Sequence, residues 1–135
     1  MESTDRAGVT AGAAPYVLLV EDETAIRAAF TRLLTREGFR VVEAGSAEEA
    51  LERVASERHA PALLVTDVVM PGMGGKALVL ALRARFPDLR IVMMSGFSED
   101  LTLRAELDSR NLIFLQKPFG TQVLMSAVRD VLAAP

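Results

Sequence analysis

The sequence predicts a doubly wound α/β domain, in which helices cover both faces of a parallel sheet of five strands in the order 2-1-3-4-5. Short apolar runs alternate with amphipathic segments from Tyr16 to near the end of the chain, which is typical of strands alternating with helices. Half of the 135 residues are apolar, so one compact domain with a substantial core is expected. Right-handed crossovers, with helices needed on both faces, favour this strand order.

Each element has its own signal in the sequence. Five short apolar runs predict the strands, at 17–20, 40–42, 63–67, 91–94 and 112–115. Helices are predicted over about 23–37, from 46, from about 75, over about 98–109, and at the end of the chain. Gly38 ends the first helix, the capping box Ser46-Ala47-Glu48-Glu49 begins the second, and Pro87 closes the third. The apolar faces comprise Ile26, Phe30, Leu33 and Leu34; Ala47, Ala50, Leu51 and Val54; Leu78, Val79, Leu82 and Phe86; Leu101 and Leu107, the thinnest; and Leu124, Val128 and Val131.

The composition argues against several classes of function. The net charge is −3 and Lys and Arg form no block, so direct nucleic-acid binding has no electrostatic support. The absence of cysteine excludes disulfides, thiolate metal sites and a cysteine nucleophile. No apolar run approaches the roughly 20 residues that span a bilayer, and no signal-peptide core opens the chain. We expect a cytoplasmic protein without membrane insertion, with a flexible tail or linker at 1–15 and a folded domain at 16–133.

Chemically useful side chains follow four of the predicted strands. Glu21 and Asp22 come after the first strand, Asp67 ends the third, Ser95 follows the fourth and Lys117 follows the fifth. The carboxyl ends of parallel strands share one edge of the sheet, and ligands bind there at the switch point. In the order 2-1-3-4-5 this point lies between the first and third strands. The topology therefore predicts one site that contains all three carboxylates.

The predicted residues suit a cation and a phosphoryl group. Three carboxylates repel one another unless a cation neutralises them, and Mg²⁺ takes oxygen ligands. A phosphoryl group fits between such a cation, the ammonium of Lys117 and the hydroxyl of Ser95. Asp67 is the best candidate nucleophile, since a carboxylate can form an acyl phosphate. Ser95 is less suited because the single histidine, His59, is predicted at the end of the second helix.

These residues form four motifs in a fixed order, VEDE (20–23), TDVVMPGMGG (66–75), MSG (94–96) and KPF (117–119). Together the motifs closely resemble the receiver domain of two-component response regulators. The resemblance covers about residues 16–133 and implies a flavodoxin-like receiver fold. It implies that Asp67 accepts a phosphoryl group from a histidine kinase or histidine phosphotransfer domain. It also implies that Mg²⁺ is held by Glu21, Asp22, Asp67 and the backbone carbonyl of Val69, and that Lys117 binds the phosphate.

The resemblance further implies a conformational switch. Ser95 matches the switch hydroxyl and Phe114 the switch aromatic, while the bond between Lys117 and Pro118 matches one that is usually cis. Phosphorylation would then reshape the face formed by the helix at 98–109, the strand at 112–115 and the last helix, which is also a candidate homodimer interface. A domain of this family is a signalling domain rather than an enzyme, although it promotes its own phosphoryl uptake and slow dephosphorylation.

Three departures from the family pattern concern the details of this site. Glu21 stands where aspartate is commoner, and Phe114 stands where tyrosine is often found. Val69 and Phe97 are apolar at positions where polar side chains can help to place an attacking water. We therefore expect a slow loss of phosphate.

Two alternatives differ in the role of the whole protein. The segments TDVVMPGMGG and MSGF resemble those of receivers at the C-terminus of hybrid sensor histidine kinases. In such a protein, residues 1–15 could be the connection from the kinase core to the receiver. Kinase activity would then belong to the larger protein. A more remote alternative is an aspartate-nucleophile phosphatase. Such an enzyme would carry its nucleophile on the first strand with a second acid two residues on, whereas Asp67 is on the third and Val69 holds the second position.

Overall fold

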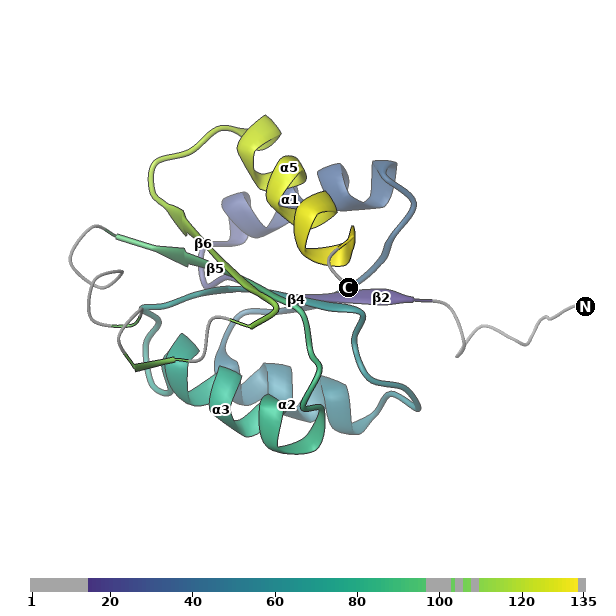
Figure 1. Ribbon diagram of the computed structural model, residues 1–135, viewed down its shortest axis with the longest axis vertical. Helices are drawn as coiled ribbons and strands as arrows, with labels where there is room; N and C mark the ends of the chain where they lie inside the picture. The colour runs from purple at the N-terminus through teal and green to yellow at the C-terminus, as the bar shows by residue number, and fades with distance from the viewer. Residues whose placement is uncertain (1–14, 97–102, 104–105, 108–109, 134–135) are drawn as a thin grey trace, which may run out of the picture.

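A single parallel sheet organises the structure, a computed structural model that describes residues 15–96, 103, 106–107 and 110–133 (Figure 1). The five strands are β2 (Tyr16–Val20), β3 (Arg40–Ala44), β4 (Leu63–Asp67), β5 (Ile91–Ser95) and β6 (Leu112–Gln116). Their order across the sheet is β3-β2-β4-β5-β6 and every neighbouring pair is parallel. Counted along the chain this is 2-1-3-4-5, so the predicted topology is confirmed.

Helices cover both faces of the sheet, as a doubly wound fold requires. The four helices described in full are α1 (Thr24–Arg36), α2 (Ala47–Ala55), α3 (Gly75–Arg85) and α5 (Thr121–Ala133). Figure 1 shows α1 and α5 on one side of the sheet and α2 and α3 on the other. The helix predicted over 98–109 falls largely outside the described residues, as does Leu101; of that segment, Leu103 and Glu106 are helical and Leu107 is buried.

The predicted start of α2 is confirmed in part. Ser46 is the N-cap, and its hydroxyl accepts a hydrogen bond from the Glu49 backbone N–H at 3.1 Å. In a capping box the Glu49 carboxylate would bond back to the N–H of the N-cap residue itself. Instead it accepts from the N–H of Gly45, one residue earlier, at 2.7 Å. Glu49 thus ties the loop before α2 to the first turn of the helix.

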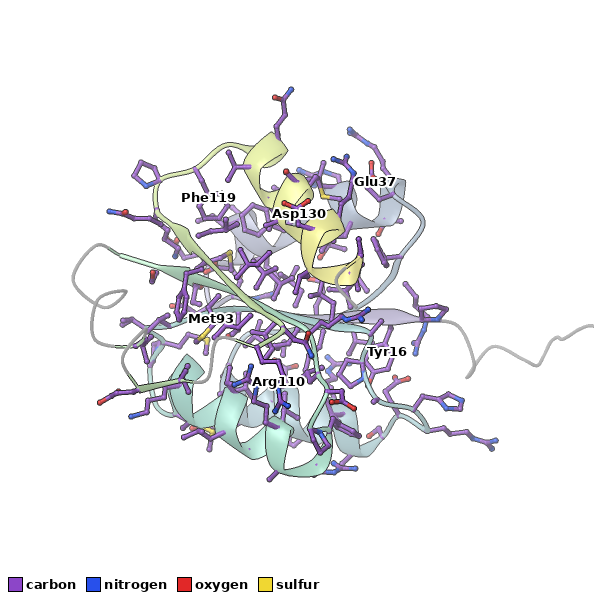
Figure 2. All side chains as sticks on the ribbon, viewed as in Figure 1. Tyr16, Glu37, Met93, Arg110, Phe119 and Asp130 are labelled. Atoms are coloured by element: carbon purple, nitrogen blue, oxygen red, sulfur yellow. The ribbon has the colours of Figure 1, made fainter. Side chains whose placement is uncertain are left out.

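The core consists of two apolar layers, one on each side of the sheet. All five residues of β2, β4 and β5 are buried, so these strands carry side chains into both layers. Met93 lies in the layer under α2 and α3, and Phe119 packs in the layer under α1 and α5 (Figure 2). Of the predicted apolar helix faces, the residues that are only half-buried are Ile26, Phe30, Leu33, Leu51 and Phe86. Within the described part of the chain, no helix has the length and apolar character needed to cross a bilayer.

Candidate functional site

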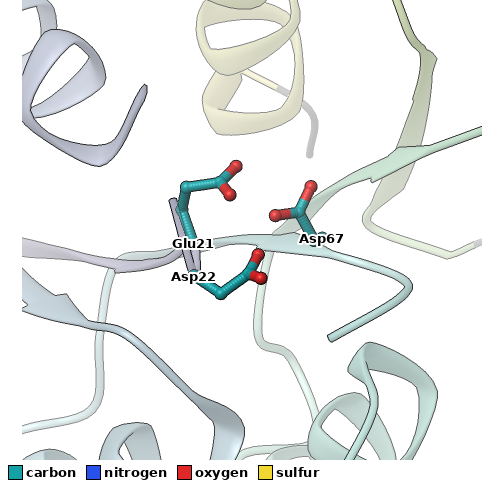
Figure 3. A group of neighbouring side chains, drawn as sticks. All are labelled: Glu21, Asp22 and Asp67. Atoms are coloured by element: carbon teal, nitrogen blue, oxygen red, sulfur yellow. The ribbon is translucent and has the colours of Figure 1, made fainter. Parts of the chain in front are cut away.

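Three carboxylates meet at the carboxyl end of the two central strands. Glu21 and Asp22 directly follow β2, and Asp67 is the last residue of β4. Val20 pairs with Thr66 in the register of these strands, so the next residue on each, Glu21 and Asp67, lie side by side. Figure 3 shows the three side chains turned toward one another, and one carboxylate oxygen from each lies within 4.8 Å of the others. The predicted gathering of acids at the switch point is therefore present.

Two of these carboxylates are almost completely buried. Glu21 is 1% exposed and Asp67 is 2% exposed, whereas Asp22 faces solvent. Burial, followed by contact with the Asp67 carboxyl group, raises the pKa of Glu21 to about 8. One oxygen of Glu21 and Oδ2 of Asp67 accept no hydrogen bond from the described residues, whereas Oδ1 of Asp67 faces the ammonium of Lys117. Buried carboxylate oxygens without donors, grouped in this way, fit a hard divalent cation such as Mg²⁺.

Lys117 supplies positive charge to the site. It follows β6, and its Nζ lies 2.5 Å from Asp67 Oδ1. Partial burial by itself would lower the pKa of the Lys117 ammonium. The combined attraction of the Asp67 and Glu21 carboxylates outweighs this effect, so the pKa of Lys117 is raised. The backbone N–H of Lys117 donates to the carbonyl of Ser95 at 2.8 Å, and the bond to Pro118 is cis, as the resemblance implied.

Ser95 and Phe114 occupy the neighbouring strands. Met94 pairs with Asp67, so Ser95 ends β5 one residue beyond the level of the aspartate. Ser95 is 1% exposed, and its hydroxyl has no hydrogen-bond partner among the described residues. Phe114 lies in β6 opposite Met93 and packs, half-buried, against the core layer under α2 and α3. Ser95 is thus at the sheet edge that holds the acids, whereas Phe114 is two residues before the end of its strand.

Two backbone contacts hold the acids in place, and sequence reasoning missed the residues that make them. Arg27 of α1 donates from Nη1 to the carbonyl of Glu21 at 2.7 Å and from Nε to Glu43 at 3.2 Å. Gly75, the first residue of α3, packs so closely behind Asp67 that an added Cβ would lie 2.1 Å from the Asp67 carbonyl oxygen. Neither contact has a local signal, because each joins residues brought together only by the fold.

Removing one carboxylate tests whether the three acids repel one another. We expect Asp22→Asn to raise the free energy of unfolding of the metal-free protein, because it removes repulsion among the three carboxylates. The increase should be only about 0.5–1 kcal/mol, because Asp22 is exposed to water. The same variant should lose most of the stabilisation that Mg²⁺ gives the wild type. Thermal unfolding with chelator and with Mg²⁺ measures both effects. Glu23→Gln makes the same change of charge one residue away, outside the carboxylate group, and should retain the Mg²⁺ response. An unchanged Mg²⁺ response in Asp22→Asn would exclude Asp22 as a ligand.

Comparison with known proteins gives a consistent family. Residues 17–129 match the model of the response regulator receiver domain family. A part of the sensor kinase CckA of Brucella abortus (strain 2308) is 40% identical over 116 residues, which are 86% of this chain and 12% of that protein. The transcriptional activator protein ExaE of Pseudomonas putida is 39% identical over 119 residues, or 87% of this chain and 55% of that protein. The chain thus spans about half of the length of the ExaE protein and a much smaller part of the length of the sensor kinase.

Solved structures share the same architecture. The response regulator receiver protein from Sinorhizobium medicae WSM419 has a TM-score of 0.79 at 29% identity, covering 90% of this chain and 97% of that one. The receiver domain from the hybrid histidine kinase CckA has a TM-score of 0.72 at 31% identity, covering 87% of this chain and 98% of that one.

Proposed function

Because the chain belongs to the response regulator receiver domain family of two-component signalling, we propose that Asp67 accepts a phosphoryl group from the phosphohistidine of a histidine kinase or a phosphotransfer protein. One observation carries this proposal most strongly. The Asp67 carboxylate is buried, its Oδ2 has no hydrogen-bond partner among the described residues, and it lies between the acids Glu21 and Asp22 and the ammonium of Lys117. A carboxylate with one oxygen free of donors, and with cationic charge close by, is suited to act as a nucleophile toward phosphorus.

The transfer is a displacement at phosphorus. An oxygen of Asp67 forms a bond to phosphorus while the bond from phosphorus to the donor's imidazole nitrogen breaks and leaves its electron pair on the imidazole. Lys117, which already contacts Asp67 Oδ1, offsets the charge on the phosphoryl oxygens. Glu21, Asp22, Asp67 and the backbone carbonyl of Val69 would hold Mg²⁺, which supplies further neutralisation of charge when bound.

We propose that Ser95 and Phe114 transmit the modification. The Ser95 hydroxyl, which has no partner among the described residues, would move to bond a phosphoryl oxygen, and Phe114 would turn inward into the space that it leaves. The face at β6 and α5 would change as a result. A groove of about 360 Å³ already lies there, and its apolar lining residues are Ile113, Leu115, Val123 and Ala127. This face is our candidate for the output or homodimer interface.

A second candidate concerns the protein to which the receiver belongs. The similarity to a sensor kinase and to the receiver of a hybrid kinase favours a receiver module of a hybrid sensor histidine kinase. In such a protein the kinase core would provide the phosphohistidine. The donor and the output are thus the parts of the proposal that depend on residues outside this domain.

The function is tested with a small phosphodonor. Incubation with acetyl phosphate and Mg²⁺ should add one phosphoryl group per chain, detected as a single mass increment, and chelation of Mg²⁺ should strongly reduce the rate. The added group should be lost in alkali, as an acyl phosphate is. The absence of a mass increment in the presence of both acetyl phosphate and Mg²⁺ would contradict the proposed function.

The exposed side chain of Val69 bears on the lifetime of the phosphorylated state. Val69 stands two residues beyond Asp67, is 66% exposed and offers no hydrogen bond to an attacking water. We expect Val69→Asn to shorten the half-life of the acyl phosphate several-fold, because positioning of the water contributes to hydrolysis. Phe97, the second apolar residue predicted to act in this way, lies outside the described residues.

Two controls separate the possible causes of faster hydrolysis. Val69→Ala removes bulk without adding a polar group, so an equal acceleration would assign the effect to steric shielding. Val123→Asn makes the same substitution at an exposed position on α5 and should leave the half-life unchanged. A Val69→Asn half-life equal to that of the wild type would show that the apolar side chain of Val69 does not slow the loss of phosphate.

A further inference from the structure

The loop between β4 and α3, residues 68–74, is the segment that follows Asp67 and carries the main chain of Val69. Its tip contacts α2. The backbone N–H of Met73 donates to Oε2 of Glu48, in the first turn of α2, at 3.0 Å. Gly72 lies against the same carboxylate with φ of 78°, and an added Cβ would lie 2.8 Å from Glu48 Oε2. A side chain from a different element thus closes over the turn of this loop.

The other anchors of the loop lie at its base. The N–H of Val68 donates to the Met94 carbonyl at 3.0 Å, and the N–H of Gly75 donates to the Val68 carbonyl at 2.8 Å. Met70 is 6% exposed and is part of the core layer under α2 and α3. For residues 71–73, the bond from the Met73 N–H to Glu48 is the one hydrogen bond that ties the loop to another described element. Without Glu48 the tip would rest only on the anchors at the base.

Glu48 contacts this loop in addition to the backbone N–H of its own residue in the first turn of α2. An acidic residue in the first turn of a helix commonly stabilises that helix. In α2 the neighbouring Glu49 makes that local contact, to the N–H of Gly45. The hydrogen bond from the Met73 N–H, followed by one from the N–H of Glu48 itself, lowers the pKa of Glu48. Two adjacent glutamates in one turn therefore hold two different segments.

We propose that Glu48 is a positioning residue for the phosphoryl-transfer site, which fixes the loop tip and thereby the main chain of Val69 beside Asp67. The inference rests on the proposed function, because the loop matters for chemistry only if its main chain helps to bind the cation. Side chains that orient metal ligands without contacting the metal commonly change affinity substantially when they are replaced. The sequence pattern does not reveal this role, since Glu48 and Met73 are distant in the chain.

The test compares three variants of the full chain by amide NMR of isotope-labelled protein during a Mg²⁺ titration. We expect Glu48→Ala to raise the Kd for Mg²⁺ about tenfold, the low end for a group that orients a metal ligand, because Glu48 is exposed. Before any Mg²⁺ is added, the Met73 amide should exchange with solvent faster in this variant. Glu48→Gln keeps an acceptor oxygen and should restore most of the affinity. Glu49→Ala disturbs the same turn of α2 and should leave the Kd unchanged.

Each outcome is decisive for the role of Glu48. A wild-type Mg²⁺ affinity in Glu48→Ala would overturn the positioning role, even if the Met73 amide exchanged faster. Equal losses of affinity in Glu48→Ala and Glu49→Ala would also overturn it, by assigning the effect to α2 as a whole. If the wild type itself gave no Mg²⁺ response, the proposed function would fail. Faster exchange of the Met73 amide in Glu48→Ala would then show only that Glu48 stabilises the loop, with no role at a cation site.

Discussion

Replacement of Asp67 with asparagine is expected to abolish phosphoryl uptake from acetyl phosphate in the presence of Mg²⁺. The amide of asparagine is a far weaker nucleophile than a carboxylate, and it removes one of the three charges that would hold the cation. It also deprives Lys117 of the carboxylate oxygen that lies 2.5 Å from its Nζ. Mass spectrometry of the intact protein over time measures the effect. The expected result is no increment in the variant at times when the wild type is fully converted.

A matched control shows that the effect belongs to the site. Asp88 lies in the turn between α3 and β5, at the opposite end of the sheet from the carboxylates, and is exposed. Asp88→Asn makes the same chemical change and should be phosphorylated at the wild-type rate. Persistent labelling of Asp67→Asn at a rate equal to that of Asp88→Asn would refute Asp67 as the acceptor.

Gly75→Ala is expected to damage both the fold and the site, although alanine usually favours a helix over glycine by about 1 kcal/mol. The added Cβ would lie 2.1 Å from the Asp67 carbonyl oxygen and 3.0 Å from Val68 Cα, and these backbone atoms cannot turn aside as a flexible side chain can. We expect the free energy of unfolding to fall by about 1–3 kcal/mol or more, which is the usual cost of adding a methyl group to a packed core. Because Asp67 itself must shift, phosphoryl uptake should slow by about 100-fold, the cost of a misplacement near 1 Å.

Urea denaturation and the rate of phosphoryl uptake together test the role of Gly75. Gly120, just before α5, provides the control, because a Cβ added there meets no atom within 4 Å. Gly120→Ala should therefore leave both measurements close to those of the wild type. A Gly75→Ala protein as stable as Gly120→Ala would mean that the backbone behind Asp67 can yield without cost.

Much of the fold could be predicted because its signals are local. Buried strands are short apolar runs, and the three central strands were placed within a residue or two of their observed bounds. The start of α2 follows from the cap at Ser46, although the pairing of Glu49 with Gly45 depends on how the preceding loop turns. The burial of the helix faces was predicted less well. Phe30 and Leu33 of α1 are only half-buried, although both pack against the core layer under α1 and α5.

The composition of the site could also be predicted, but its internal supports could not. Parallel strands necessarily deliver Glu21 and Asp67 to one edge, so topology alone brings them together. The contacts of Arg27 with Glu21, of Gly75 with Asp67, and of Glu48 with Met73 depend on packing between separate elements. Such contacts leave no periodic pattern in the sequence. The raised pKa of Glu21 likewise depends on burial and on the nearby Asp67 carboxyl group, which only the assembled fold provides.

The most direct test of the central claim is to identify the phosphorylated residue itself in the wild type. Borohydride reduces an acyl phosphate to an alcohol, so peptide mass spectrometry after reduction marks the side chain that carried the phosphoryl group. The protein would be phosphorylated with Mg²⁺ and acetyl phosphate, reduced and digested, with Asp67→Asn treated in parallel. We predict reduction at Asp67 alone, in the peptide that includes TDVVMPGMGG (66–75). Reduction at Glu21, Asp22 or another carboxylate, with Asp67 unmodified, would contradict the account.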